Sequence, residues 1–185
     1  MQITDTAARG AEQLAQCLAA VDEAQARALA EEIARARAVF VAGAGRSLLM
    51  LRCLAMRLMH LGLTAYVVAD TTTPAFTADD LLICASGSGT TASVVAIAEK
   101  ARSLGGRVAA LTIEATSPLG ELANTVVQVH AYSDKRDTGA ELPVLPGGAL
   151  FEQSVLLLGD ALVYPLSELR QVPTDRAFDL HANLE

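Results

Sequence analysis

The stretch LLICASGSGTT, residues 81–91, decides the fold. Its first half, residues 81–85, is a continuous apolar run of the kind that forms a strand buried on both faces of a parallel sheet. The second half holds two glycines and four hydroxyl side chains, and a run compatible with a helix follows at residues 92–103. Free backbone N–H groups and the positive end of that helix would face one small volume. We therefore expect an anion to bind at residues 86–91.

Composition and length favour one domain with helices packed on a parallel sheet. The chain has 185 residues, of which 52% are hydrophobic but only 4% aromatic, with no tryptophan. This length supports one full core and is short for two ordinary domains. A core built from alanine, leucine and valine is typical of parallel sheets covered by helices.

Charge and cysteine usage exclude several classes of partner. The net charge of −7 argues against nucleic acid and anionic membranes, since both attract a basic surface. Residues 1–17 lack a basic segment followed by an apolar one, so we expect a cytoplasmic protein. The three cysteines are widely spaced and lack the spacing of metal ligands, so we expect core thiols and neither a metal nor a cofactor.

Strands and helices alternate along the middle of the chain. Apolar runs predict five strands, at residues 38–42, 64–69, 81–85, 107–113 and 125–130, and helices are expected between most of them. Parallel neighbours need crossover connections, so the pattern predicts a doubly wound parallel sheet, for which we take the order 2-1-3-4-5. Residues 1–37 are expected to form N-terminal helices, 131–148 a long loop that is mobile or covers a site, and 149–185 a helix, which Pro165 ends, and a tail.

A second glycine-rich turn, GAGRS at residues 43–47, follows the first strand and opens a helix over residues 48–61. In a sheet of this order, strands 1 and 3 are neighbours whose helices leave toward opposite faces, so both turns open into one crevice. Four hydroxyls could meet there on one phosphate, those of Ser47, Ser86, Ser88 and Thr91. In the alternative interpretation, these small residues only make tight turns and cap helices.

The two turns do not match the commoner phosphate motifs. No lysine follows Gly89, as a P-loop would require, and Leu48 stands where a dinucleotide-binding turn has its third glycine. The two turns and several other motifs instead resemble the SIS (sugar isomerase) domain family, and within it the 6-phospho-3-hexuloisomerases. The resemblance covers almost the whole chain, and it rests on GAGRS, AMRLMHLG (residues 55–62), TTTP (71–74), SGSG (86–89), LFE (150–152) and the terminal HANLE.

The resemblance implies a flavodoxin-like fold, a homotetramer and an isomerase of the ribulose monophosphate pathway of formaldehyde fixation. The substrate would be D-arabino-hex-3-ulose 6-phosphate and the product fructose 6-phosphate. Members hold the sugar phosphate with the hydroxyls of the two turns and use a glutamate early in a later helix as the base, a place that Glu152 occupies. The chain departs from close relatives at Thr90, where they usually carry glutamate, and at Ala149, where they often carry serine. The alternatives are another phosphosugar isomerase and a module that binds sugar phosphates without chemistry.

His60 is a second candidate catalytic residue, able to polarise the carbonyl or shuttle a proton. It lies thirteen residues after Ser47 on one helix, or about 20 Å at 1.5 Å per residue, which is too far to serve the same phosphate site. If it is catalytic, we predict that it reaches the site of a neighbouring subunit; otherwise it is a structural histidine at a helix end. The further candidate substrate contacts are Gly45, Arg46, Gly87, Gly89, Thr90 and His181. Arg46 could instead pair with Asp70 or Glu152.

Overall fold

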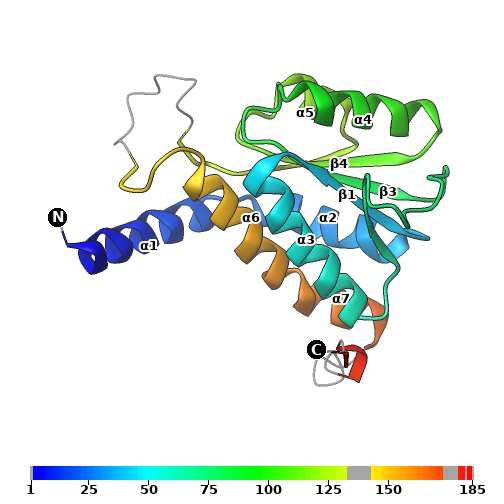
Figure 1. Ribbon diagram of the computed structural model, residues 1–185, viewed down its shortest axis with the longest axis horizontal. Helices are drawn as coiled ribbons and strands as arrows, with labels where there is room; N and C mark the ends of the chain where they lie inside the picture. The colour runs from blue at the N-terminus through cyan, green and yellow to red at the C-terminus, as the bar shows by residue number, and fades with distance from the viewer. Residues whose placement is uncertain (1, 133–142, 173–178, 182, 185) are drawn as a thin grey trace.

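The protein is built on one five-stranded parallel sheet with the predicted strand order, β2-β1-β3-β4-β5. The structure is a computed structural model that describes residues 2–132, 143–172, 179–181 and 183–184. The strands are β1 (Val39–Gly43), β2 (Ala65–Val67), β3 (Leu81–Ala85), β4 (Arg107–Thr112) and β5 (Thr125–Gln128). The expected α/β class and doubly wound arrangement are therefore confirmed (Figure 1).

Helices cover both faces of the sheet, as Figure 1 shows. One face carries α4 (Ala92–Ser103) and the short α5 (Pro118–Leu122), and the other carries α2 (Glu23–Arg35), α3 (Gly45–His60), α6 (Ala149–Ala161) and α7 (Val163–Arg170). The first helix, α1 (Ile3–Ala19), packs against α6. Successive strand residues point to opposite faces, so Val39 and Val41 join one core while Phe40 and Ala42 join the other. Burial on both faces explains why the strands are continuous apolar runs.

Several element boundaries follow from local hydrogen bonds. The side chain of Asp22 accepts from the backbone N–H of Ala24 at 2.7 Å and caps α2. The carboxylate of Asp80, just before β3, is fully buried and accepts from the backbone N–H of Thr77 and from Arg37, both at 2.7 Å. These bonds keep the pKa of Asp80 below its ordinary value although burial alone would raise it. They fix the turn that leads into the central strand.

Two helix boundaries differ from the prediction. Helix α3 begins at Gly45 rather than at residue 48, so Arg46 and Ser47 lie in its first turn. Pro165 does not end the last long helix. That helix, α6, ends at Ala161, and after Leu162 a new helix, α7, begins at Val163. In the first turn of α7 a proline costs little, since the N–H that it lacks would have no acceptor within the helix.

The run Ala149–Arg170 is the one described stretch that passes a test of length and apolar composition for a membrane span. Core helices of soluble proteins pass the same test, and 44% of its most apolar window is buried inside the protein. Its first part, α6, packs against α3 and α1. The buried contacts of α6 agree with a helix of the protein core.

The loop predicted at residues 131–148 falls largely on residues 133–142, which lie outside the described residues, so its proposed mobility stays a prediction. Its last part is anchored on α1. The backbone N–H of Val144 donates to the side-chain oxygen of Gln13 at 2.9 Å, and Leu145 packs over Gly10, where an added Cβ would lie 2.6 Å from it. Helix α1 therefore holds the segment that leads into α6.

Candidate active site

Strands β1 and β3 end side by side and deliver the two glycine-rich turns to one edge of the sheet. Gly43, the last residue of β1, pairs with Ala85, the last residue of β3. A Cβ at residue 43 would lie 3.1 Å from the backbone nitrogen of Leu48 and 3.3 Å from the carbonyl oxygen of Ala85, so a larger residue would have to push this backbone apart by a few tenths of an ångström. Helices α3 and α4 then leave toward opposite faces of the sheet (Figure 1). The two turns therefore lie at the switch point of the sheet, where a crevice is expected in folds of this kind.

The first turn leaves the start of α3 without a side-chain cap. Ala44 is the residue before the helix and has no side-chain oxygen to accept a hydrogen bond from it. Gly45 follows with a φ of 55°, a left-handed conformation that favours glycine. The first backbone N–H groups of a helix have no acceptor within it, so those around Arg46 and Ser47 are suited to bind an anion.

The second turn places its four hydroxyls in two hydrogen-bonded pairs. Ser86 Oγ and Thr91 Oγ1 lie 2.9 Å apart, and Ser88 Oγ and Thr90 Oγ1 are also 2.9 Å apart. Thr91 immediately precedes α4, yet its side chain makes no capping hydrogen bond. The alternative interpretation, in which these residues only cap helices, is thus not what the structure shows for Thr91. The hydroxyls instead face one another around the start of an uncapped helix.

Ser117 and Thr112, which the sequence analysis did not single out, pack against the second turn at Gly89. Gly89 has a φ of 62°, and a Cβ added there would lie 1.9 Å from Ser117 Oγ and 3.2 Å from Thr112 Oγ1. The backbone N–H of Leu119 donates to the carbonyl oxygen of Gly89 at 3.1 Å. The sequence signal was Ser117-Pro118, which is typical of a helix start and indeed begins α5, but nothing in it indicates contact with a turn 28 residues earlier.

The start of α6 brings Glu152 next to both turns. Phe151 contacts Gly87, where an added Cβ would lie 3.4 Å from its ring. The next residue, Glu152, has a side chain that is only 14% exposed, and one of its oxygens, Oε2, accepts a hydrogen bond from Arg46 Nε in the first turn of α3. The candidate base and the two glycine-rich turns are therefore neighbours, although Glu152 lies more than 60 positions from either turn in the sequence.

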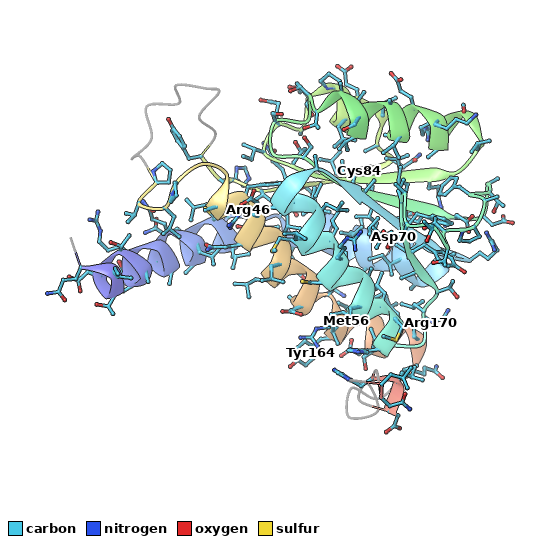
Figure 2. All side chains as sticks on the ribbon, viewed as in Figure 1. Arg46, Met56, Asp70, Cys84, Tyr164 and Arg170 are labelled. Carbon is cyan, nitrogen blue, oxygen red and sulfur yellow. The ribbon has the colours of Figure 1, made fainter. Side chains whose placement is uncertain are left out.

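Of the alternatives for Arg46, the structure has the pair with Glu152. Asp70 instead binds Arg52, which lies nearly two turns further along α3, at 2.7 Å. Figure 2 shows Arg46 at the end of α3 near the start of α6, with Asp70 away from it. Among the residues that the structure describes, no group of three or more His, Cys, Asp or Glu side chains could hold a metal ion.

His60 and His181 lie at the other end of α3, away from the turns of the same chain. His60 is the last residue of α3 and is 5% exposed, and its ring stacks on that of His181 with centroids 5.1 Å apart. Burial lowers the pKa of His60, and the neighbouring His181 and Arg57 lower it further. Neither ring can reach a sugar phosphate bound about 20 Å away in its own subunit. A catalytic role for either stays a prediction that requires a second subunit.

The cysteines and the tail complete the list of expected residues. Cys17 and Cys84 are buried in the core, and burial raises the pKa of the Cys84 thiol to about 12. Cys53 is partly buried on α3. In the tail, residues 182 and 185 lie outside the described residues, and contact of His181 with a substrate stays a prediction.

Comparison with known proteins agrees with this geometry. The family model described as the SIS domain matches residues 32–137, which include both turns and all five strands. The chain belongs to the SIS domain family. Among curated SIS relatives, the 3-hexulose-6-phosphate isomerase of Mycobacterium gastri is 45% identical over 99% of this chain and 92% of its own length. The 3-hexulose-6-phosphate isomerase of Bacillus subtilis is 39% identical over the full length of both chains.

A solved structure extends the comparison to three dimensions. A Methanococcus jannaschii protein, whose crystal structure led to an inferred function of 3-hexulose-6-phosphate isomerase, is 33% identical to this chain. Its TM-score is 0.77 over 88% of this chain and 87% of that one. The fold that holds the two turns is thus shared with a SIS protein to which the same activity has been assigned.

Proposed function

We propose that this protein is a 3-hexulose-6-phosphate isomerase, which interconverts D-arabino-hex-3-ulose 6-phosphate and fructose 6-phosphate in the ribulose monophosphate pathway of formaldehyde fixation. The observation that carries the proposal is the position of Glu152, mostly buried and beside two helix starts that lack side-chain caps. The site thus combines a carboxylate base with an anion-binding crevice. The full-length relatives of the same name support this substrate over other phosphosugars.

The phosphate group is held by the two turns. Helix starts attract anions because their first N–H groups are unpaired and the helix dipole is positive there. The hydroxyls of Ser86 and Thr91 lie 2.9 Å apart, and those of Ser88 and of Ser47 belong to the same two turns, so each can add a donor. No cluster of lysines is needed, which is consistent with the net charge of −7.

Glu152 then transfers the proton. Its carboxylate removes the proton from C2 of the 3-ketose, the C2–C3 bond gains double-bond character, and the former C3 carbonyl becomes part of an enediol. Return of the proton at C3 and movement of the O2 proton to O3 give the C2 carbonyl of fructose 6-phosphate. The electrons stay within the substrate, so the reaction needs no redox cofactor.

The test follows fructose 6-phosphate formation from the 3-ketose with the wild type, Glu152→Gln and Glu99→Gln. Glu99 lies exposed on α4 and provides a matched carboxylate control. We expect Glu152→Gln to lose activity by roughly 10³-fold while keeping affinity for fructose 6-phosphate, and Glu99→Gln to behave as the wild type. Unchanged turnover in Glu152→Gln would exclude it as the base. An inactive wild type that still binds sugar phosphates would favour a binding module instead.

We also propose that the protein is a cytoplasmic homotetramer of single-domain subunits in which neighbours share sites. Cys17 of α1 and Leu29 of α2 belong to the same core as α3 and α6, which supports one domain. Large apolar side chains are exposed on the packed helices α3 and α6, namely Leu49, Met56, Met59 and Leu157. Such a surface is typical of contacts between subunits. Its proximity to the pair of His60 and His181 supports a site completed by a neighbour.

Mixed oligomers test the shared site. His60→Ala removes a group at the C-terminal end of α3, and Ser88→Ala removes a hydroxyl from the turn between β3 and α4. Each variant alone should therefore be inactive. If sites are shared, subunits carrying one variant supply what the other lacks, and unfolding and reassembling the mixture should restore part of the activity. Mixtures that stay inactive, although the variants assemble together, would contradict sharing.

A further inference from the structure

Arg46 occupies a distinctive position between the phosphate-binding crevice and the base. It is the second residue of α3, between Gly45 and the candidate phosphate ligand Ser47. Its side chain is 60% exposed and reaches across to the mostly buried carboxylate of Glu152 on α6. The guanidinium atom of Arg46 that makes the hydrogen bond is Nε, which donates to Glu152 Oε2. The ion pair therefore links the first turn directly to the residue proposed as base.

The bond divides the two oxygens of Glu152 between different surroundings. Oε2 accepts from Arg46, while Oε1 points toward Gly148, the residue just before α6. A Cβ at residue 148 would lie 3.6 Å from Oε1, in ordinary contact, so the glycine places no side chain against this oxygen. The φ of Gly148 is −82°, which any residue adopts, so backbone geometry does not explain the glycine. Glycine at residue 148 thus keeps one side of Oε1 free of a side chain from that position.

We propose that Arg46 is a positioning residue that holds Oε2 of Glu152 and leaves Oε1 as the oxygen that accepts the substrate proton. The proposal rests on the function proposed above and deepens it by assigning roles to the two carboxylate oxygens. A glutamate side chain has several rotatable bonds, and a charged hydrogen bond to one oxygen fixes the direction in which the other points. A base must be held to within a fraction of an ångström of the reacting proton, so loss of this bond affects the chemical step.

Kinetic constants can distinguish an Arg46 that positions Glu152 from an Arg46 that binds the substrate phosphate directly. An arginine that binds substrate phosphate strengthens ground-state binding, so its removal raises KM. An arginine that positions the base leaves substrate binding to the two turns, so its removal lowers kcat. Lysine offers a point charge on a flexible stem rather than a planar group, so it would hold Oε2 less well than arginine does.

The experiment measures kcat and KM for Arg46→Ala, Arg46→Lys and, as a matched control, Arg52→Ala, whose partner is Asp70 on the same side of the sheet. We expect kcat to fall roughly 10- to 100-fold in Arg46→Ala with KM changed less than about threefold, and less in Arg46→Lys. Added guanidinium ion, at tens of millimolar, should restore part of the kcat of Arg46→Ala and leave Arg52→Ala unchanged. A raised KM with a normal kcat, or a kcat that guanidinium does not restore, would overturn the proposal.

A structural readout separates this proposal from the assigned reaction. In a crystal structure of Arg46→Ala, the Glu152 carboxylate should leave its wild-type position or occupy more than one. A carboxylate that stays in place would overturn the positioning role, whatever the substrate is. An inactive wild type would instead refute the proposed reaction, and the position of Glu152 in the variant would still decide the role of Arg46.

Discussion

Replacing Gly89 by alanine should destabilise the protein far more than replacing Gly45, although both glycines have a left-handed backbone in one of the two glycine-rich turns. Their φ angles are 62° and 55°, so each alanine meets a similar backbone penalty of about 1–2 kcal/mol. The surroundings differ, because a Cβ at Gly89 would lie 1.9 Å from Ser117 Oγ and 2.4 Å from its Cβ. At Gly45 no atom lies within 4 Å.

The clash sets the size of the difference. Inserting a carbon into a packed site costs about 1–3 kcal/mol, so Gly89→Ala should lower the free energy of unfolding by about 2–5 kcal/mol in total. For a chain of this size, 1 kcal/mol corresponds to a change of about 2–4 °C in Tm, which predicts a loss of roughly 5–15 °C. Gly45→Ala should lose about 1 kcal/mol, since alanine also reduces the entropy of the unfolded chain.

Urea and thermal unfolding followed by circular dichroism measure both variants, and calorimetry measures their affinity for fructose 6-phosphate. Gly89→Ala should also bind the sugar phosphate weakly, because the turn must move away from Ser117. Equal losses of stability in Gly89→Ala and Gly45→Ala would show that the Ser117 side chain can move away from the new Cβ without lowering the free energy of unfolding. The second turn would then not be supported by α5 in the way that the contacts indicate.

Three further predictions concern stability. Ala69 has a φ of 74° on the surface, so Ala69→Gly should stabilise the protein by about 0.5–1 kcal/mol in urea unfolding; a loss of stability would contradict the strain. The pKa of His60 is lower in the folded protein than the ordinary value of 6.5. Below pH 6.5 the His60 imidazole is therefore protonated more readily in the unfolded chain than in the folded protein. Stability should therefore fall as the pH drops below about 6.5, and His60→Gln should weaken this dependence. Asp80→Asn should lower the free energy of unfolding by about 2–3 kcal/mol by weakening the buried bond to the half-exposed Arg37, and a neutral effect would refute its role.

Much of the fold could be predicted because the central strands β1, β3 and β4 are mostly apolar and buried on both faces. The run at residues 81–85 matches β3 residue for residue, and 92–103 matches α4. Boundaries were less certain where glycine or proline has two uses. Gly45 reads as part of a turn but begins α3, and Pro165 reads as a helix end but lies in the first turn of α7. In both cases the deciding factor was where neighbouring elements pack.

The candidate site was predictable in its residue types but not in its pairings. The glycines and hydroxyls after β1 and β3 indicated an anion site because parallel strands end at one edge. The sequence left Arg46 with several partners, and it gave no sign that Ser117 supports Gly89. Such contacts join residues 28 to 106 positions apart, and local patterns carry no information about them.

The sequence by itself determined the layers of this protein and the glycine- and hydroxyl-rich turns after β1 and β3, since local periodicity gives the elements and parallel strands need crossover connections. Only the tertiary structure decided that Thr91 pairs with Ser86 instead of capping α4, that Arg46 holds Glu152, and that His60 stacks on His181 far from the crevice. Side-chain partners depend on how helices pack across the sheet. That packing is a property of the whole core, to which residues distant in sequence contribute together.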